Sequence, residues 1–289
     1  MEGTGNDFVI VDGERAGLSG APQAELEDLA RRACDRHFGI GADGFILALP
    51  SARADLRMRM FNVDGSEAEA CGNGMRCLAR FARDRNLARG ERLTVETLAG
   101  VVACHFVPGG RTSSAQAAGG QGVTVRVDMG VPRLRRSEIP MLGRDVDRVV
   151  DERIAAAGKD FFATCVSMGN PHCVVFVEDI GEVDLQTWGP ALETHPVFPR
   201  RTNVEFVAVE DRGRLRMLVW ERGSGSTLSC GSGASAAAVA AQLKGLSGPV
   251  TPLTVPGGEL EVEWAADGHV WLSGPANEAF TGTWPRRGE

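Results

Sequence analysis

Two cysteines open the same local pattern, a Cys-Gly-x-Gly turn followed by a run of good helix formers. The first is Cys71-Gly72-Asn73-Gly74 and the second is Cys230-Gly231-Ser232-Gly233, about 160 residues later. The first N–H groups of a helix have no partner within it and lie at the positive end of its dipole. A cysteine there is biased toward thiolate, and a carboxylate would bind the same N–H groups. We therefore expect two matched thiols that face one anionic ligand.

The other cysteines are interpreted as buried small hydrophobic residues, which is the usual role of a cysteine. They are Cys34, Cys77, Cys104, Cys165 and Cys173. The total of seven is odd, the spacing is dispersed and no CxxC pair occurs. Neither a disulfide framework nor a metal site is therefore expected.

The composition is that of an ordinary globular protein, with 43% hydrophobic and 24% charged residues among 289. A net charge of −7 argues against a general nucleic-acid or membrane-surface binder, because those need a basic face. No apolar run approaches the roughly 20 residues of a membrane span, and no signal-like segment begins the chain. We expect a cytoplasmic protein.

Period-two alternation and short apolar runs predict strands, and apolar residues at helical spacing predict helices. The expected strands cover residues 8–12, 45–49, 55–61, 93–97, 101–107, 123–127, 161–168, 173–177, 204–209, 215–220, 253–262 (a hairpin) and 269–272, with helices at 23–36, 184–193 and after each cysteine. Residues 108–122, rich in Gly, Ser, Ala and Gln, are predicted to be a linker. The turn Gly3-Thr4-Gly5 comes so early that we expect a strand leading into it to be missing, and the true start to lie upstream.

The two halves resemble one another beyond the cysteines. Gly5-Asn6 and Gly169-Asn170 are each followed, two residues later, by a strand that ends in an acidic residue. An internal duplication implies two similar domains related by a pseudo-twofold axis. We place them at residues 1–115 and 120–274. The axis would bring both cysteine turns to one interdomain cleft.

Several polar residues stand at the same turns and strand ends. Each has an ordinary explanation alone, because asparagine suits left-handed turns and a Glu-Arg pair at a strand end is usually solvated. Their clustering on both repeats favours a ligand site instead. They are Asn6, Asn62, Asn73, Asn170, Asn203, Glu221, Arg222 and His172.

Six blocks together resemble the signatures of the diaminopimelate epimerase family. The blocks appear in the family's order and cover almost the whole chain. They are Gly3 to Phe8, Phe61 to Ser66, Cys71 to Cys77, Gly169 to His172, Arg201 to Val204, and Glu221 to Gly223 with Cys230 to Gly233.

The resemblance implies a mixed α/β (α+β) fold of two pseudo-symmetric domains, each a strongly curved, mostly antiparallel sheet around a central helix. The first domain would be completed by a C-terminal strand within 275–289. It implies interconversion of LL- and meso-2,6-diaminopimelate, without metal or pyridoxal phosphate, in lysine and peptidoglycan synthesis. It also implies a homodimer with a contact at Phe280.

The same resemblance assigns roles to residues. Cys71 and Cys230 match the catalytic pair, one thiolate removing the α-proton and the other thiol protonating the opposite face. The backbone N–H groups of Gly72, Asn73, Gly231 and Ser232 would hold the reacting carboxylate. The substrate-binding positions would be Asn6, Asn62, Asn170, Asn203, Glu221 and Arg222, and His172 and Glu221 would tune the thiols.

One departure and several alternatives accompany this interpretation. Ser226 stands where the family pattern has glutamate, so we expect an altered pKa of Cys230 or an altered loop. A racemase or epimerase of another amino acid on the same fold is the nearest alternative. A non-catalytic amino-acid-binding protein and a structural metal site are the others. Exchange of the substrate α-proton with solvent deuterium would separate an enzyme from a binder.

Overall fold

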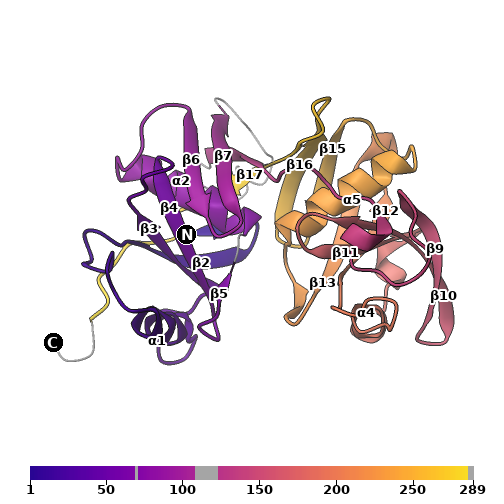
Figure 1. The fold of residues 1–289 in the computed structure, drawn as a ribbon, viewed down its shortest axis with the longest axis horizontal. Helices are drawn as coiled ribbons and strands as arrows, with labels where there is room; N and C mark the ends of the chain where they lie inside the picture. Colours follow the sequence, from indigo (N-terminus) through magenta and orange to yellow (C-terminus); the bar gives the residue numbers. More distant parts are fainter. Residues whose placement is uncertain (69–70, 108–122, 286–289) are drawn as a thin grey trace.

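The computed structural model describes residues 1–68, 71–107 and 123–285, and shows two halves side by side (Figure 1). The predicted linker at 108–122 lies outside the described residues. Each half wraps strands around one helix that begins at a cysteine turn. The expected fold class is confirmed.

The first half follows the predicted order closely. Its elements are β1 (Glu2–Gly3), β2 (Asn6–Asp12), α1 (Gln23–Cys34), β3 (Gly44–Leu49), β4 (Leu56–Asn62), β5 (Glu67–Ala68), α2 (Gly72–Asp84), β6 (Arg92–Thr97), β7 (Gly100–Val107) and β8 (Val123–Asp128). The expectation that the strand before the first glycine turn is missing is wrong, because β1 leads into that turn and pairs with β2. Helix α1 ends two residues before the predicted limit of 36.

The second half repeats the order with one added hairpin strand. Its elements are η1 (Arg136–Glu138), β9 (Val149–Ala156), β10 (Lys159–Ser167), β11 (Pro171–Val177), η2 (Ile180–Glu182), α4 (Leu185–Glu193), β12 (Asn203–Val209), η3 (Asp211–Gly213), β13 (Leu215–Glu221), β14 (Gly225–Thr227), α5 (Gly231–Leu243), β15 (Val250–Val255), β16 (Gly258–Trp264) and β17 (Val270–Ala276). The sequence did not predict β9, whose exposed positions outnumber its buried ones.

Strand pairing shows that the halves are equivalent residue by residue. Strands β2 and β3 are parallel with Phe8 opposite Gly44, and β11 and β12 are parallel with His172 opposite Asn203. Strand β4 then pairs antiparallel with β3 and parallel with β6, as β13 does with β12 and β15. The inferred duplication is therefore present in the hydrogen-bond register itself.

The halves meet through β8 and β17, which pair antiparallel with Val127 opposite Leu272. These strands hold the same place in their repeats, since β8 also pairs with β7 and β17 with β16. The pseudo-twofold axis consequently runs between them. Val127 packs in the core around α2 and Leu272 in the core around α5. The predicted boundary between residues 115 and 120 lies in the undescribed stretch and stays a prediction; it assigns β8 to the second domain, whereas β8 pairs with β7 and packs in the core of the first half.

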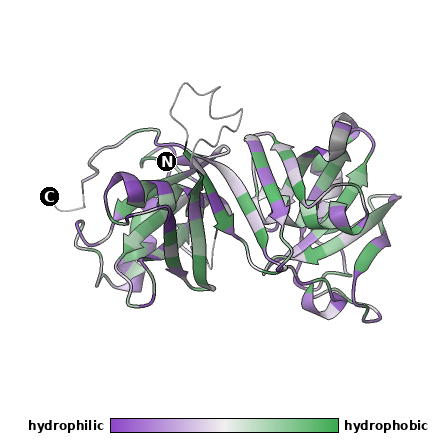
Figure 2. Ribbon diagram, turned by 90° about the horizontal axis from the view of Figure 1, so that it is seen from above, coloured by the Kyte–Doolittle hydropathy of each residue, from purple (hydrophilic) through white to green (hydrophobic). Residues whose placement is uncertain are grey.

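Helices α2 and α5 are the centres of the two cores. Helix α2 buries a face of mixed apolar residues that includes Met75 and Leu78. Helix α5 is alanine-rich and buried almost all round, so the surrounding strands approach it closely. Seen from above, hydrophobic and hydrophilic stretches alternate along the strands that wrap these helices (Figure 2).

The C-terminal segment returns to the first half (Figure 1). Strand β17 ends at Ala276, so the strand predicted within 275–289 stops after two residues of that range. Trp284 then packs beside α1, with the Arg32 guanidinium 5.5 Å from its ring centroid. Among the described residues, no helix is long and apolar enough to span a membrane.

Candidate active site

Each cysteine caps the helix that follows it. Cys71 has extended backbone angles, and its Sγ accepts a hydrogen bond from the Gly74 N–H at 3.4 Å. Cys230 adopts nearly the same angles and accepts from the Gly233 N–H, also at 3.4 Å. Both sulfur atoms therefore lie at the positive end of a helix dipole, as the glycine turns predicted.

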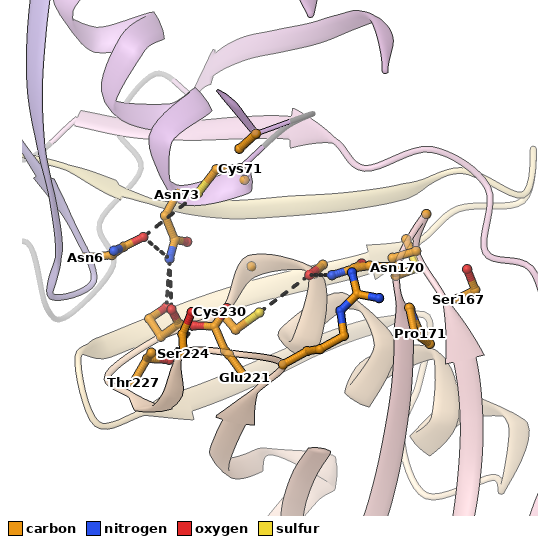
Figure 3. A pocket seen from close by; sticks show the side chains of 18 of the residues that line it. Asn6, Cys71, Asn73, Ser167, Asn170, Pro171, Glu221, Ser224, Thr227 and Cys230 are labelled. Carbon is orange, nitrogen blue, oxygen red and sulfur yellow. Dashed lines mark hydrogen bonds between the residues drawn. The ribbon is translucent and has the colours of Figure 1, made fainter. Parts of the chain in front are cut away.

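The two helix N-termini are in contact. A Cβ atom placed on Gly231 would lie 3.4 Å from Gly72 Cα and 3.3 Å from Asn73 Oδ1. Asn73 Nδ2 crosses between the halves and donates to the Ser229 carbonyl at 3.2 Å (Figure 3). Glycine is needed at these turns because a side chain would separate the helix ends.

We expect the substitution Asn73→Ala to weaken this contact. The Ser229 carbonyl would lose a buried donor, so the free energy of unfolding should fall by about 1–2 kcal/mol. Misplaced helix ends should also lower kcat/KM by roughly tenfold or more. Thermal denaturation and turnover assays measure the two effects. A variant that matches the parent in both would show that Asn73 does not hold the halves together.

Both turns open on one cleft of about 1470 Å³ between the halves. Most residues predicted for the site line it. They are Asn6, Asn62, Cys71, Gly72, Asn73, Asn170, Glu221, Arg222, Cys230, Gly231 and Ser232. Among the described residues, no group of three or more His, Cys, Asp or Glu side chains could hold a metal ion.

Asn6 is oriented by residues from its own half. Its Nδ2 donates to Asp43 Oδ2 at 2.6 Å, and Arg36 in turn pairs with Asp43 at 2.8 Å. The Asn6 Oδ1 atom accepts from Asn73 Nδ2 at 3.4 Å and lies 3.9 Å from the Cys71 sulfur. The amide is therefore fixed beside one thiol. Asp43 and Arg36 also line the cleft and were not predicted to belong to the site.

Glu221 affects the pKa of both cysteine thiols. Burial raises the pKa of its carboxyl group, which the Thr227 hydroxyl and the Cys230 thiol oppose by hydrogen bonding. Its negative charge contributes to a raised pKa at both Cys71 and Cys230. The neighbouring Arg222 is exposed and donates to the Arg200 carbonyl at 3.2 Å. A carboxyl group and a guanidinium on neighbouring residues thus both line the cleft.

The expected bias of the cysteines toward thiolate is wrong in this structure. Burial raises the pKa of the Cys71 thiol, although the Gly74 N–H opposes the rise. Burial raises the pKa of Cys230 well above its usual value, with Glu221 and Glu205 adding to the effect. Desolvation of the charged form therefore outweighs the helix N–H groups.

A chain of hydrogen bonds leads from Cys230 into the protein. The Cys230 sulfur lies 3.5 Å from Ser232 Oγ, which accepts from Asn170 Nδ2 at 3.2 Å. His172 Nε2 is 3.0 Å from Asn170 Oδ1, and its Nδ1 is 2.7 Å from Glu205 Oε1. His172 is fully buried and is linked to the Cys230 thiol through Asn170 and Ser232.

Comparison with known proteins decides the family. A family model described as diaminopimelate epimerase matches residues 1–134 and 164–278. A relative of that name from Moorella thermoacetica is 52% identical over 287 residues, covering 99% of this chain and 98% of the relative. Another from Desulforudis audaxviator is 51% identical with the same coverage. The chain belongs to the diaminopimelate epimerase family.

Solved structures show that the fold of this family member is shared more widely. A hydroxyproline epimerase from Agrobacterium vitis aligns with a TM-score of 0.64 at 16% identity, covering 95% of this chain and 86% of that one. A PhzF-family phenazine biosynthesis protein from Bacillus anthracis has the same TM-score at 15% identity, covering 96% and 93%. This chain is thus an amino-acid epimerase of the diaminopimelate epimerase family on a fold with several uses.

Three predicted residues of this epimerase do not line the cleft. Asn203 is buried; its Nδ2 donates to the Pro171 carbonyl and its Oδ1 accepts from the Arg222 N–H, both at 2.9 Å. It therefore positions Arg222. His172 lies behind Asn170, and Phe280, 67% exposed, follows β17. The role of Phe280 in a dimer stays a prediction.

Glu205 is the main residue that the sequence analysis missed. It is fully buried in β12 and pairs with the equally buried His172. The available signal was an acidic residue at one position of the apolar run Val204-Glu205-Phe206-Val207. Such a residue needs a buried partner, which only the neighbouring strand reveals.

Ser226, the departure from the family pattern, is exposed on β14. The acidic groups that raise the pKa of Cys230 are Glu221 and Glu205. Ser226 lines the cleft but is exposed and is not among the groups that shift the pKa of Cys230. We therefore expect Ser226→Glu to change kcat/KM by no more than about threefold. Steady-state kinetics of the variant give the answer. A larger gain would mean that glutamate at this position assists turnover.

Proposed function

We propose that the protein interconverts LL- and meso-2,6-diaminopimelate, using Cys71 and Cys230 as the two proton-transfer groups. The observation that carries the proposal is the contact between two helix N-termini, each capped by one of these cysteines, at a single cleft. Family membership supports the substrate. The proposed chemistry needs no metal or pyridoxal phosphate.

The α-proton of an amino acid is weakly acidic, so its removal requires stabilisation of the charge that develops on the carboxylate. Helix geometry leaves the N–H groups of Gly72, Asn73, Gly231 and Ser232 without intrahelical partners. In the proposal these groups hold the reacting carboxylate between α2 and α5. Two helix dipoles then act on the same developing charge.

Proton transfer proceeds in two steps. The thiolate of one cysteine takes the α-proton, and the C–H electron pair stays on the α-carbon and spreads into the carboxylate. The thiol on the opposite face then gives its proton to that carbon. The configuration inverts, and the two sulfur atoms exchange their protonation states.

The distal end of diaminopimelate carries an ammonium and a carboxylate. Glu221 and Arg222 offer opposite charges at the cleft, and Asn6, Asn62 and Asn170 offer both donors and acceptors. These groups would select a doubly zwitterionic substrate. We further propose a cytoplasmic homodimer that serves lysine and peptidoglycan synthesis and binds neither nucleic acid nor membrane.

Proton NMR of LL-diaminopimelate in deuterated water tests the proposal directly. With the purified protein, the α-proton signal should disappear and the meso isomer should accumulate. A binding protein would leave the signal intact. An enzyme that exchanges proline or hydroxyproline but not diaminopimelate would retain the two-thiol chemistry and refute the substrate.

A further inference from the structure

The strand register identifies which residues of the two halves occupy equivalent positions. Phe8 opposes Gly44 in the first half, as His172 opposes Asn203 in the second. Two residues further along the second strand of each pair are Ile46 and Glu205. The apolar pair Phe8 and Ile46 is therefore replaced by the ionisable pair His172 and Glu205.

These positions lie directly behind the two glycine turns. A Cβ on Gly74 would lie 3.0 Å from Ile46 Cδ1, and one on Gly233 would lie 2.7 Å from Glu205 Oε1. The same points are 3.5 Å from Cys71 Cβ and 3.3 Å from Cys230 Cβ. The side chain packed behind the Cys71 turn is thus the hydrocarbon of Ile46, and the one packed behind the Cys230 turn is the carboxyl group of Glu205.

Glu205 is wholly enclosed. It has no exposed surface, and within residues 1–68, 71–107 and 123–285 its Oε2 atom has no hydrogen-bond partner. Its other oxygen pairs with His172 Nδ1 at 2.7 Å. Glu205 is closer than His172 to the Gly233 turn, so its negative charge dominates there. Since it does not reach the cleft, it can act only through Cys230 and its turn.

The first half has a buried charge of the opposite sign, on the helix that Cys71 caps. Arg76 of α2 is fully buried, donating from Nε to the Pro275 carbonyl at 3.2 Å and from Nη2 to Thr4 Oγ1 at 3.0 Å. Its Nη1 finds no hydrogen-bond partner in the described part of the chain. The equivalent residue of α5 is Ser235, which is uncharged and donates to the Gly231 carbonyl.

We propose that Glu205 is a positioning residue that keeps Cys230 protonated, so that Cys71 is the first of the two thiols to ionise. The symmetric scaffold then supplies one base and one acid before substrate arrives. This inference rests on the proposed two-thiol function. It explains why one cysteine starts as the base and the other as the acid: a buried carboxylate that does not contact the substrate makes their pKa values differ.

The charged groups around each sulfur agree with this assignment. Cys230 faces Glu221 from β13 and Glu205 from β12, with His172 of β11 behind Glu205 and Cys71 across the cleft. Glu221 also raises the pKa of Cys71, whereas Arg76 of the helix that Cys71 caps lowers it. Cys77, next to Arg76, stays a thiol because burial raises its pKa to about 12. Two acids therefore oppose ionisation of Cys230, and one acid and one cation act on Cys71.

The test measures thiol ionisation without substrate. Iodoacetamide labelling across a pH series, with peptide mass spectrometry, gives the pH midpoint for Cys71 and Cys230 separately. Ultraviolet thiolate absorbance of the Cys71→Ala and Cys230→Ala proteins gives the same midpoints where labelling is slow. In the parent protein we expect the lower midpoint at Cys71. The reverse order overturns the proposal whether or not any variant folds.

Glu205→Gln removes the charge and keeps an acceptor for His172. We expect labelling of Cys230 at neutral pH to become roughly threefold faster or more, with a lower midpoint, while Cys71 stays unchanged. Glu193→Gln, which removes another buried carboxylate, is the matched control and should leave both midpoints in place. An unchanged or slower Cys230 in a folded Glu205→Gln protein refutes the inference. Because no substrate is present, loss of epimerase activity alone bears only on the proposed function.

Discussion

Alanine in place of either Cys71 or Cys230 is expected to abolish epimerisation, with kcat reduced by roughly 10³-fold to 10⁴-fold in each variant. Inversion needs a proton removed from one face and another delivered to the opposite face, so neither thiol can replace the other. The double variant should be little worse than the single ones, because the two groups act as a unit. Conversion of LL-diaminopimelate followed by NMR measures the loss.

Solvent exchange adds a sharper expectation for these variants. A protein with one remaining thiol can still remove an α-proton and return deuterium to the same face. Each single variant should therefore exchange one stereoisomer without inverting it. Cys77→Ala is the control, because Cys77 is buried beside the first turn but has no proposed role in proton transfer. Inversion by both single variants would eliminate the two-thiol mechanism.

Gly257→Ala is expected to have the largest effect among substitutions outside the cleft wall. A Cβ at Gly257 would lie 1.8 Å from the Thr4 carbonyl oxygen, so the backbone must move. Thr4 is already held in the left-handed region at φ 55°, and its Oγ1 lies 2.9 Å from Ser229 Oγ in the other half. We expect the free energy of unfolding to fall by about 1–3 kcal/mol.

The Gly257→Ala substitution should also alter the active site, because Thr4 and Gly5 directly precede Asn6 in the chain. Displacing Asn6 moves the amide beside Cys71, so kcat/KM should fall even at temperatures where the variant is folded. Gly20→Ala is the matched control, since no atom lies within 4 Å of a Cβ there. Thermal denaturation and kinetics of the pair test the idea. Equal behaviour of the two variants would mean that the contact between Thr4 and Gly257 is not needed.

Much of the fold could be predicted because its signals are local. The cysteine caps, the glycine turns and the period-two strands depend on neighbouring residues, and the structure reproduces them. Strand β9 was missed because few of its residues are buried, so it lacks a clear apolar pattern. The C-terminal stretch was expected to be a strand but only its first residues pair, because β17 ends opposite Val123, the first residue of β8.

The sequence by itself determined that two equivalent units exist and that each begins its central helix at a cysteine. Those features follow from residue order, since a cap and its helix are adjacent in the chain. Tertiary structure decided which charges lie behind each cysteine. Glu205 lies behind the Gly233 turn only because β12 packs against α5, and Arg76 is enclosed only because Thr4 and Pro275 pack around it. Desolvation likewise exists only in the folded protein, which is why the thiols are less acidic than their helix positions alone predict.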